Sequence, residues 1–471
     1  MHQCTRRKFL ELSLYSAALT AIVPQTLNAK SGKEVEQLIF DRVKALKPEN
    51  GLTLRVLFPE GSLPNIQVVA NNFTAGTGVE IAFSKAVVDD INTRILIEHA
   101  AKKQSFDVAL PATFGLPDLV EAEALADLTA YAKIYEPQIG YKKSLYNLGD
   151  RYKDKFYGYQ TDGDAYIMFY NKNFFENTEQ RKRYEDKFSQ KLTIPETWKQ
   201  LDQVMQFFHD SDQGRFGGCM FRTSRYVVWE WWIRAHAKGM LPFAEDMSAN
   251  INSDAGVAAL EDLVEATAYQ HPACETHGLF DNWKEFASGH SAVNIGWGGT
   301  QKYIQSDKSK IKGQIQCAAT PEVSYFNWGW NYVAAAGSAY HEIAYLFGLY
   351  ATLPEQSTQA VKEDGFFDPF RIEHYDDSDI QEIYGRDFLE AHKSAIITAI
   401  PDFYIQGHGD YIQALQENIL LTDRGDITAK QALDFTANTW NMLTEELGVE
   451  NQKKQWQFLK SKYPKHIVSK R

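Results

Sequence analysis

The stretch Leu52-Thr-Leu-Arg-Val-Leu-Phe58, followed by Pro59-Glu60-Gly61, decides the fold prediction. An apolar, β-branched run that ends in loop residues predicts a buried strand. Four segments continue the pattern: a helix at 66–74, a strand at 79–83, a helix at 90–101 and a strand at 106–110. This alternation is typical of a parallel α/β sheet, in which ligands lie beyond the carboxyl ends of the strands.

The rest of the chain continues without a visible linker or internal repeat. Thr197 is a plausible N-cap for a helix with apolar residues at Leu201, Val204, Met205 and Phe208. Further elements are predicted: an extended run at 157–170, helices at 255–268, 341–353 and 428–447, and a strand at 291–295. We therefore expect domains that interleave along the chain.

Length and composition narrow the class of protein. The 471 residues suggest two or three domains of about 150 residues each. A net charge of -12 argues against nucleic-acid binding and against attraction to an anionic membrane surface. Aromatic residues make up 13% of the chain. A large core could account for them, and they would also suit a ligand that has both apolar faces and hydroxyl groups.

Residues 1–29 have the pattern of an export signal. Thr5-Arg-Arg-Lys-Phe-Leu10 is basic, and the apolar run at 12–23 would span only about 18 Å as a helix, short of a ~30 Å hydrocarbon core. The paired arginines resemble a twin-arginine signal, with a buried helix as the alternative. We therefore expect a mature protein in the periplasm.

Three cysteines remain in that oxidising compartment: Cys219, Cys274 and Cys317. One disulfide is plausible, but the sequence does not choose among the three pairings.

Five motifs, in this order, resemble the family 1 periplasmic solute-binding proteins of ABC importers, which take up sugars, oligosaccharides and polyols. They are Phe169-Tyr-Asn-Lys-Asn-Phe-Phe175, Ile194-Pro-Glu-Thr-Trp198, Ile251-Asn-Ser-Asp-Ala-Gly256, the run from Phe286 to Trp297, and Trp330-Asn-Tyr-Val-Ala-Ala-Ala336. The resemblance extends from about Leu52 to the C-terminus.

The resemblance implies a two-lobe α/β (Venus-flytrap) fold with interleaved lobes and a multi-strand hinge. The expected boundaries are lobe 1 at 50–160 plus 332–370, lobe 2 at 165–328 plus 372–471, and hinge crossings near 161–165, 329–332 and 366–371. It also implies a monomer whose partners are a small carbohydrate or polyol and the membrane subunits of an ABC permease.

Trp297 is the first candidate ligand contact, because Gly296 and Gly298 on either side would expose the indole face. Trp328 and Trp330 flank Gly329 and share one face of a strand, so one would line the cleft and the other would pack behind it. Trp229, Trp231 and Trp232 are instead expected in a helix core of lobe 2.

Four polar or loop residues are further candidates. The resemblance places a hydroxyl-binding acid at Asp164, and polar contacts in the loops after the first and third strands at Glu60, Thr113 and Phe114; Phe114 departs from the charged residues of some relatives. For Asp164 the alternative is a solvated turn acid.

An arginine guanidinium could form bidentate hydrogen bonds with paired hydroxyls or with a carboxylate. Arg222, Arg225 and Arg371 resemble cleft-facing arginines of sugar and polyol binders, with salt bridges as the alternative.

Catalytic motifs are absent from the sequence: there is no Gly-x-Ser-x-Gly, His-Glu-x-x-His, P-loop or dinucleotide fingerprint. His271-Pro-Ala-Cys-Glu-Thr-His277 could offer zinc ligands, but a fourth ligand is not visible and Pro272 disrupts helical facing, so a structural loop is favoured. We predict no catalytic residue, no cofactor and no metal.

The leading hypothesis is a periplasmic binding protein that captures a neutral sugar or polyol by lobe closure and delivers it to an ABC permease. Two alternatives stay open. One is a ligand-sensing or accessory protein for a receptor kinase or an oxidoreductase, and the other is a cofactor- or metal-dependent enzyme.

Overall fold

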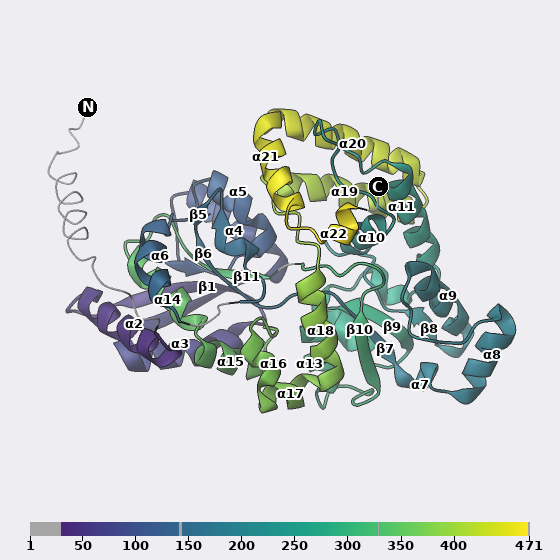
Figure 1. Cartoon of the computed structure of the whole chain (residues 1–471), viewed down its shortest axis with the longest axis horizontal. Coiled ribbons are helices and arrows are strands. Elements are labelled where there is room, and N and C mark those ends of the chain that lie inside the picture. Colours follow the sequence, from purple (N-terminus) through teal and green to yellow (C-terminus); the bar gives the residue numbers. More distant parts are fainter. Residues whose placement is uncertain (1–29, 141–143, 328, 470–471) are drawn as a thin grey trace.

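The structure is a computed structural model that describes residues 30–140, 144–327 and 329–469. It contains two α/β bodies that lie side by side, and each is built around its own mixed sheet (Figure 1). We call the five-stranded sheet with its helices lobe 1, and the four-stranded sheet with its helices lobe 2. The predicted export signal, residues 1–29, lies outside the described residues.

The sheet of lobe 1 has the strand order β2-β1-β3-β11-β6. Its strands are β1 (Thr53–Pro59), β2 (Glu80–Ala86), β3 (Val108–Ala109), β6 (Gly158–Thr161) and β11 (Trp330–Ala334). β1 pairs in parallel with β2 and β3, as the alternating pattern predicts. β11 pairs antiparallel with both β3 and β6, so the complete sheet is mixed.

Amphipathic helices cover this sheet. They are α2 (Gly32–Leu46), α3 (Leu63–Thr77), α4 (Ile91–Ala100), α5 (Leu116–Glu121), α6 (Thr129–Tyr135), α14 (His341–Ala351) and α15 (Pro354–Lys362). The sequence analysis did not predict α2, which buries Val35, Ile39 and Val43 against α3 and α14. Their spacing of four places these side chains on one helix face.

The sheet of lobe 2 has the order β10-β7-β9-β8. Its strands are β7 (Ile167–Asn171), β8 (Phe216–Gly218), β9 (Ser291–Gly296) and β10 (Ile315–Ala319). The helices around it are α7 (Lys172–Phe175), α8 (Thr178–Phe188), α9 (Trp198–Phe208), α10 (Val227–Ala237), α11 (Asp254–Thr267), α12 (Leu279–Phe286), α13 (Gly298–Gln305), α16 (Ile372–Asp376), α17 (Ser378–Tyr384) and α18 (Arg386–Thr398). Thr197 caps α9 as predicted, in a reciprocal capping box with Gln200.

Four C-terminal helices extend lobe 2, drawn in yellow-green to yellow in Figure 1. They are α19 (His408–Asp423), α20 (Ala429–Glu446), α21 (Val449–Lys460) and α22 (Lys465–Val468). α19 and α20 pack against α10 and α11, so that α10 is buried along its whole length. Trp229, Trp231 and Trp232 on α10 are at most 2% exposed, which confirms their prediction as core residues.

Three segments connect the lobes. Residues 162–166 join β6 to β7, and the segment that begins with residues 320–327 leads from β10 to β11. Residues 363–371 lead from α15, which packs on α3, to α16 and α17 beside α13. Between residues 30 and 469, outside the undescribed gaps, no helix is long and apolar enough to cross a membrane.

Candidate ligand-binding site

A cavity lies where the two lobes and their connections meet. Lobe 1 and lobe 2 both contribute to its wall, which is formed by Val88, Asp164, Tyr226, Leu279, Trp283, Trp297, Gly299, Trp330 and Phe366. Five of these nine residues are aromatic, and Asp164 is the one acid among them. The cavity holds about 30 Å³, room for about one water-sized group, so the lobes are closed against each other in this structure.

Trp297 stands between β9 and α13, at the edge of this cavity. Its indole Nε1 donates a 3.1 Å hydrogen bond to the carbonyl of Asn327, and its ring centre lies 4.7 Å from that of Tyr166. The side chain is 5% exposed, so the neighbouring glycines do not expose it. They permit close approach instead, because a Cβ on Gly298 would lie 2.3 Å from Asp368 Oδ1.

Trp330 opens β11 and reaches the cavity from lobe 1. It is 2% exposed, and its ring centre lies 5.7 Å from that of Phe366 in the third connection. Trp328, which we predicted on the same strand face, lies outside the described residues.

Asp164 belongs to a group of three buried acids at the junction of the lobes. Asp162 and Asp164 come from the β6–β7 connection and Asp368 from the third connection, and one carboxylate oxygen of each lies within 4.8 Å of the others. Burial raises the pKa of all three, that of Asp368 to about 7, and the negative charge of Asp162 adds to the increase at Asp164.

The sequence analysis missed Asp162 and Asp368 as site residues, although both fall in the predicted hinge crossings. Asp368 Oδ2 accepts the backbone N–H of Gly298 at 2.7 Å, at the start of α13. Asp162 Oδ1 accepts the backbone N–H of Asp368 at 2.6 Å, which ties the two connections together. Their positions in two hinge segments that were predicted to converge could have identified them as site residues.

Lys302 is a partly buried cation whose charge lowers the pKa of Asp162 and Asp368. Burial lowers its pKa to about 8. Its Nζ lies 2.7 to 3.2 Å from four backbone carbonyl oxygens, that of residue 361 in α15 and those of residues 363, 365 and 367 in the third connection. The side chain therefore fixes the path of that connection against α13.

Thr113 and Phe114 lie in the loop after β3, as predicted, but neither lines this cavity. Thr113 Oγ1 donates a 2.7 Å hydrogen bond to Asn331 Oδ1 inside lobe 1. Phe114 stacks on His408 of lobe 2, with ring centres 4.5 Å apart at an angle of 18°.

Phe114 lines a second cavity between the lobes, of about 340 Å³. α4 and α5 form one wall, and α10 and α19 form the other. Contacts between the lobes beside this cavity include Arg225 Nη1 with Asp90 Oδ1 at 2.8 Å, and the N–H of Gly407, which donates to Asp118 at 2.5 Å.

Three other predicted contacts lie outside both cavities. Glu60 is half-exposed and pairs with Lys85 at 2.6 Å. Arg222 is buried in lobe 2, where Nη1 lies 2.7 Å from Glu230 Oε2. Arg371 is 1% exposed and donates to the carbonyl of Thr352 at 3.1 Å.

A family model described as bacterial extracellular solute-binding protein matches residues 69–383. This chain belongs to that family. No curated protein matches the sequence.

Solved solute-binding proteins share the fold. One from Agrobacterium radiobacter, in complex with ribitol, is 16% identical, covers 84% of this chain and 100% of its own, and has a TM-score of 0.74. The maltose-bound MalE3 of T. maritima is 17% identical over 83% of this chain and 100% of its own, at 0.71. One from Agrobacterium vitis, with D-mannitol, is 17% identical over 84% and 99%, at 0.70.

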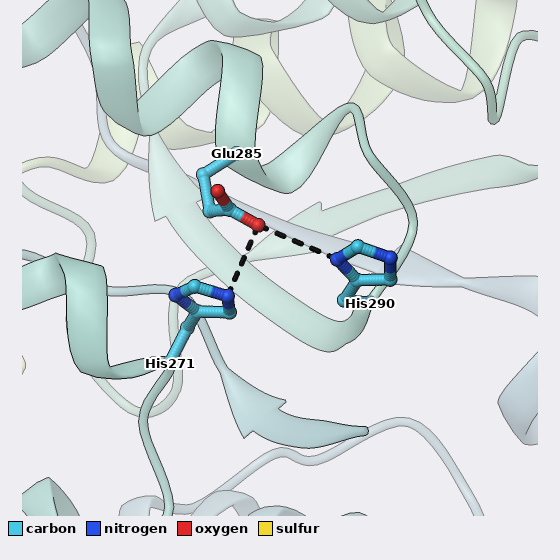
Figure 2. A group of neighbouring side chains, drawn as sticks. All are labelled: His271, Glu285 and His290. Atoms are coloured by element: carbon cyan, nitrogen blue, oxygen red, sulfur yellow. Dashed lines mark ion pairs between the residues drawn. The ribbon is translucent and has the colours of Figure 1, made fainter. Parts of the chain in front are cut away.

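The solute-binding protein has a second group of potential metal ligands in lobe 2, among residues that line neither cavity. Glu285 lies between two imidazoles, with Oε1 3.1 Å from His271 Nε2 and 3.6 Å from His290 Nδ1 (Figure 2). His271 Nδ1 accepts the backbone N–H of Ala273 at 3.1 Å, so Nε2 carries the proton and donates to Glu285. A metal on Nε2 would require the opposite tautomer, and the arrangement therefore favours a hydrogen-bonded pair.

The motif His271–His277 does not converge on one point either. Cys274 Sγ lies 3.8 Å from Cys219 Sγ, and His277 is absent from the His271–Glu285–His290 group. The favoured sequence interpretation, a structural loop, agrees with this placement.

Proposed function

We propose that this protein is the periplasmic solute-binding component of an ABC importer, and that it captures a sugar or a polyol between its lobes for delivery to the permease. The observation that carries the proposal is the cavity at the lobe junction, where three indoles surround one carboxylate. Membership of the solute-binding family and the ribitol, maltose and mannitol held by proteins of this fold support the same ligand class.

We propose that an acidic side chain and aromatic side chains make different contacts with the ligand. Asp164 would accept hydrogen bonds from ligand hydroxyls, and Trp297 and Trp330 would cover the C–H faces of the ligand. Removing about 100 Å² of apolar surface from water contributes ~2.5 kcal/mol per stacked ring. One or two such rings and several hydrogen bonds suffice for micromolar affinity, about -8 kcal/mol.

Trp283 joins this set as a residue that sequence reasoning missed. It is 7% exposed and lines the cavity, and among the described residues its Nε1 has no hydrogen-bond partner. A buried indole N–H without an acceptor is costly, and a ligand oxygen would satisfy it. The 30 Å³ of the closed cavity requires the lobes to open before a sugar enters.

The mechanism we propose is non-covalent. Bending at the three connections opens the cleft, the ligand binds, and closure buries it in the form that the permease recognises. Export through the twin-arginine route to the periplasm is part of the same proposal and rests on residues 1–29.

Calorimetric titration of the purified full-length chain with a panel of sugars and polyols tests the proposal. We expect Trp297→Ala to weaken binding of the best ligand more than tenfold. A matched pair of milder variants controls for folding, because Trp297 and Trp231 each donate Nε1 to a backbone carbonyl at 3.1 Å. Trp297→Phe should weaken binding and Trp231→Phe should not; no binding by any panel member would contradict the proposal.

A further inference from the structure

The cavity at the lobe junction combines aromatic faces with negative charge. Its wall contains Tyr226, Trp283, Trp297, Trp330 and Phe366, and a carboxylate, but none of its nine residues is basic. The negative faces of aromatic rings attract cations, most strongly where water is excluded. A neutral polyol would pack on the rings but would gain nothing from the attraction that the rings and the carboxylate exert on a cation.

Negative charge behind the cavity reinforces this feature. The charges that act most strongly on Asp164 are those of three other acids, Asp162, Asp368 and Asp402, and all of them raise its pKa in addition to the effect of burial. Asp162 is 1% exposed and Asp402 is also 1% exposed, so solvent does not screen them. Ionisation of Asp164 is therefore unfavourable unless a cation lies beside it.

Lys302 has no free N–H group with which to neutralise the three acids. An ammonium group has three N–H donors, and the Nζ of Lys302 already lies within 3.2 Å of four carbonyl oxygens. Its charge lowers the pKa of Asp162 and Asp368 but does not outweigh the effect of burial.

Within the described part of the chain, one oxygen in the acidic group has no hydrogen-bond donor. Asp162 Oδ1 accepts backbone N–H groups from Gly163 and Asp368. Asp162 Oδ2, buried to the same degree, has no hydrogen-bond partner among the described residues. Because no donor compensates this oxygen, the negative charge behind Asp164 favours a cation beside Asp164.

We propose that the captured solute carries a protonated amine, as an amino sugar or an amino polyol does, and that its ammonium group lies beside Asp164 against the indole faces of Trp297 and Trp330. The inference rests on the proposed function, which it narrows from hydroxylated solutes in general to cationic ones. A single ammonium group is close in size to the space that the closed cavity retains. Asp162 and Asp368 act as positioning residues, because they bear on the ligand through Asp164.

Matched ligand pairs that differ in one group test the inference. Titration calorimetry compares sorbitol with 1-amino-1-deoxysorbitol, and glucose with glucosamine and with the neutral N-acetylglucosamine. We expect the amine to bind about thirtyfold more tightly than its neutral partner, the gain of one desolvated cation–π contact plus one charge-assisted hydrogen bond. Acetylation of the amine should remove that gain, a result that requires no variant of the protein.

Protein variants locate the effect. Asp164→Asn keeps the shape of the side chain and should reduce the amine preference to less than threefold. Asp307→Asn removes a charge from a surface acid that is 96% exposed and should leave the preference unchanged.

The outcomes separate the two proposals. Equal or tighter binding of the neutral partner, or binding of neither partner, overturns the inference and leaves the proposed function intact; the proposed function fails only when no member of the sugar and polyol panel binds. CaCl2 and MgCl2 are tested alone by thermal shift. Stabilisation of the wild-type protein by either salt, lost in Asp164→Asn and unaccompanied by amine binding, identifies a metal site and also overturns the inference.

Discussion

The phenol oxygen of Tyr226, in lobe 2, donates a 2.8 Å hydrogen bond to Oδ1 of Asp89, in lobe 1. Tyr226 lines the aromatic cavity at the lobe junction, and Asp89 lines the larger cavity beside it. The bond therefore forms part of the wall between the two cavities and also holds the lobes together. The adjacent pair Arg225–Asp90 crosses at the same point.

Loss of that bond should shift the molecule toward an open form. Tyr226→Phe removes one hydrogen bond that forms only on closure, worth about 1 kcal/mol, or about fivefold in the closed-to-open ratio. Small-angle X-ray scattering without ligand should show a larger radius of gyration. Tyr170→Phe is the control, because Tyr170 donates to Gln316 within lobe 2; an equal change in both variants would contradict the interlobe role.

The pH dependence of stability should contain a contribution from Asp118. Burial raises the pKa of this carboxyl to about 6, against an ordinary value of 3.8, while the N–H groups of Gly407 and Gly409 act in the opposite direction. The folded form therefore binds the proton more tightly than the unfolded form, and stability falls as the pH rises from about 4 to 6.

Asp118→Asn isolates that contribution. The difference in melting temperature, wild type minus variant, should be larger at pH 4.5 than at pH 7.5. Glu60→Gln, at a half-exposed acid of lobe 1, provides the control and should show no such trend. A difference that is constant or that grows with pH would contradict the position of Asp118 against Gly407 and Gly409.

Arg222 should matter for stability and leave ligand affinity unchanged. Its side chain is fully buried with Glu230, which Arg234 also contacts through Nε at 2.8 Å. Arg222→Met leaves part of the charge of Glu230 uncompensated, at a cost of about 3 kcal/mol in the free energy of unfolding. Urea unfolding and calorimetric titration measure both quantities.

An exposed pair gives the matched control for this variant. Arg215→Met breaks the surface pair with Asp210 and should cost less than about 1 kcal/mol. A tenfold loss of affinity in Arg222→Met at unchanged stability would instead assign Arg222 to the ligand, as the family resemblance implied.

Cys219 and Cys274 should form the disulfide that the sequence could not assign. Their sulfur atoms lie 3.8 Å apart and both side chains are buried, whereas Cys317 Sγ lies 3.6 Å from Gln301 Oε1. Refolding with glutathione disulfide should transfer two electrons and two protons from the two thiols to glutathione disulfide, which becomes two molecules of glutathione. The intact mass of the protein should fall by two hydrogen atoms.

The bridge would close a separation of 55 residues, and the chain-entropy relation gives a gain of about 4 kcal/mol. Cys219→Ser should abolish the mass change and the gain, and Cys317→Ser should abolish neither. An unchanged mass of the wild-type protein would show that the thiols stay reduced.

Local signals predicted the framework of the fold. β1, β2 and β3 follow from apolar runs, and the cap of α9 follows from Thr197, because each depends on a few consecutive residues. The long extended run at 157–170 hid the break between β6 and β7, since its residues are buried on both sides of the break. α2 was missed although its apolar spacing is helical.

The site was predicted less completely, because its parts are distant in the sequence. Trp297, Trp330 and Asp164 do meet at one cavity, but Asp162 bonds Asp368 across 206 residues, a pairing that no local pattern indicates. The sequence does not distinguish an arginine that faces a ligand cleft from one that forms a buried ion pair. Arg222 lies in a pair because α10 supplies Glu230 beside it.

A crystal structure of the full chain with the tightest-binding member of the ligand panel tests the central claim most directly. The account predicts ligand density between Trp297 and Trp330, with a polar ligand atom within hydrogen-bond distance of Asp164. Density for that ligand at a site away from the lobe junction, or a junction cavity still empty at saturating ligand, would contradict it.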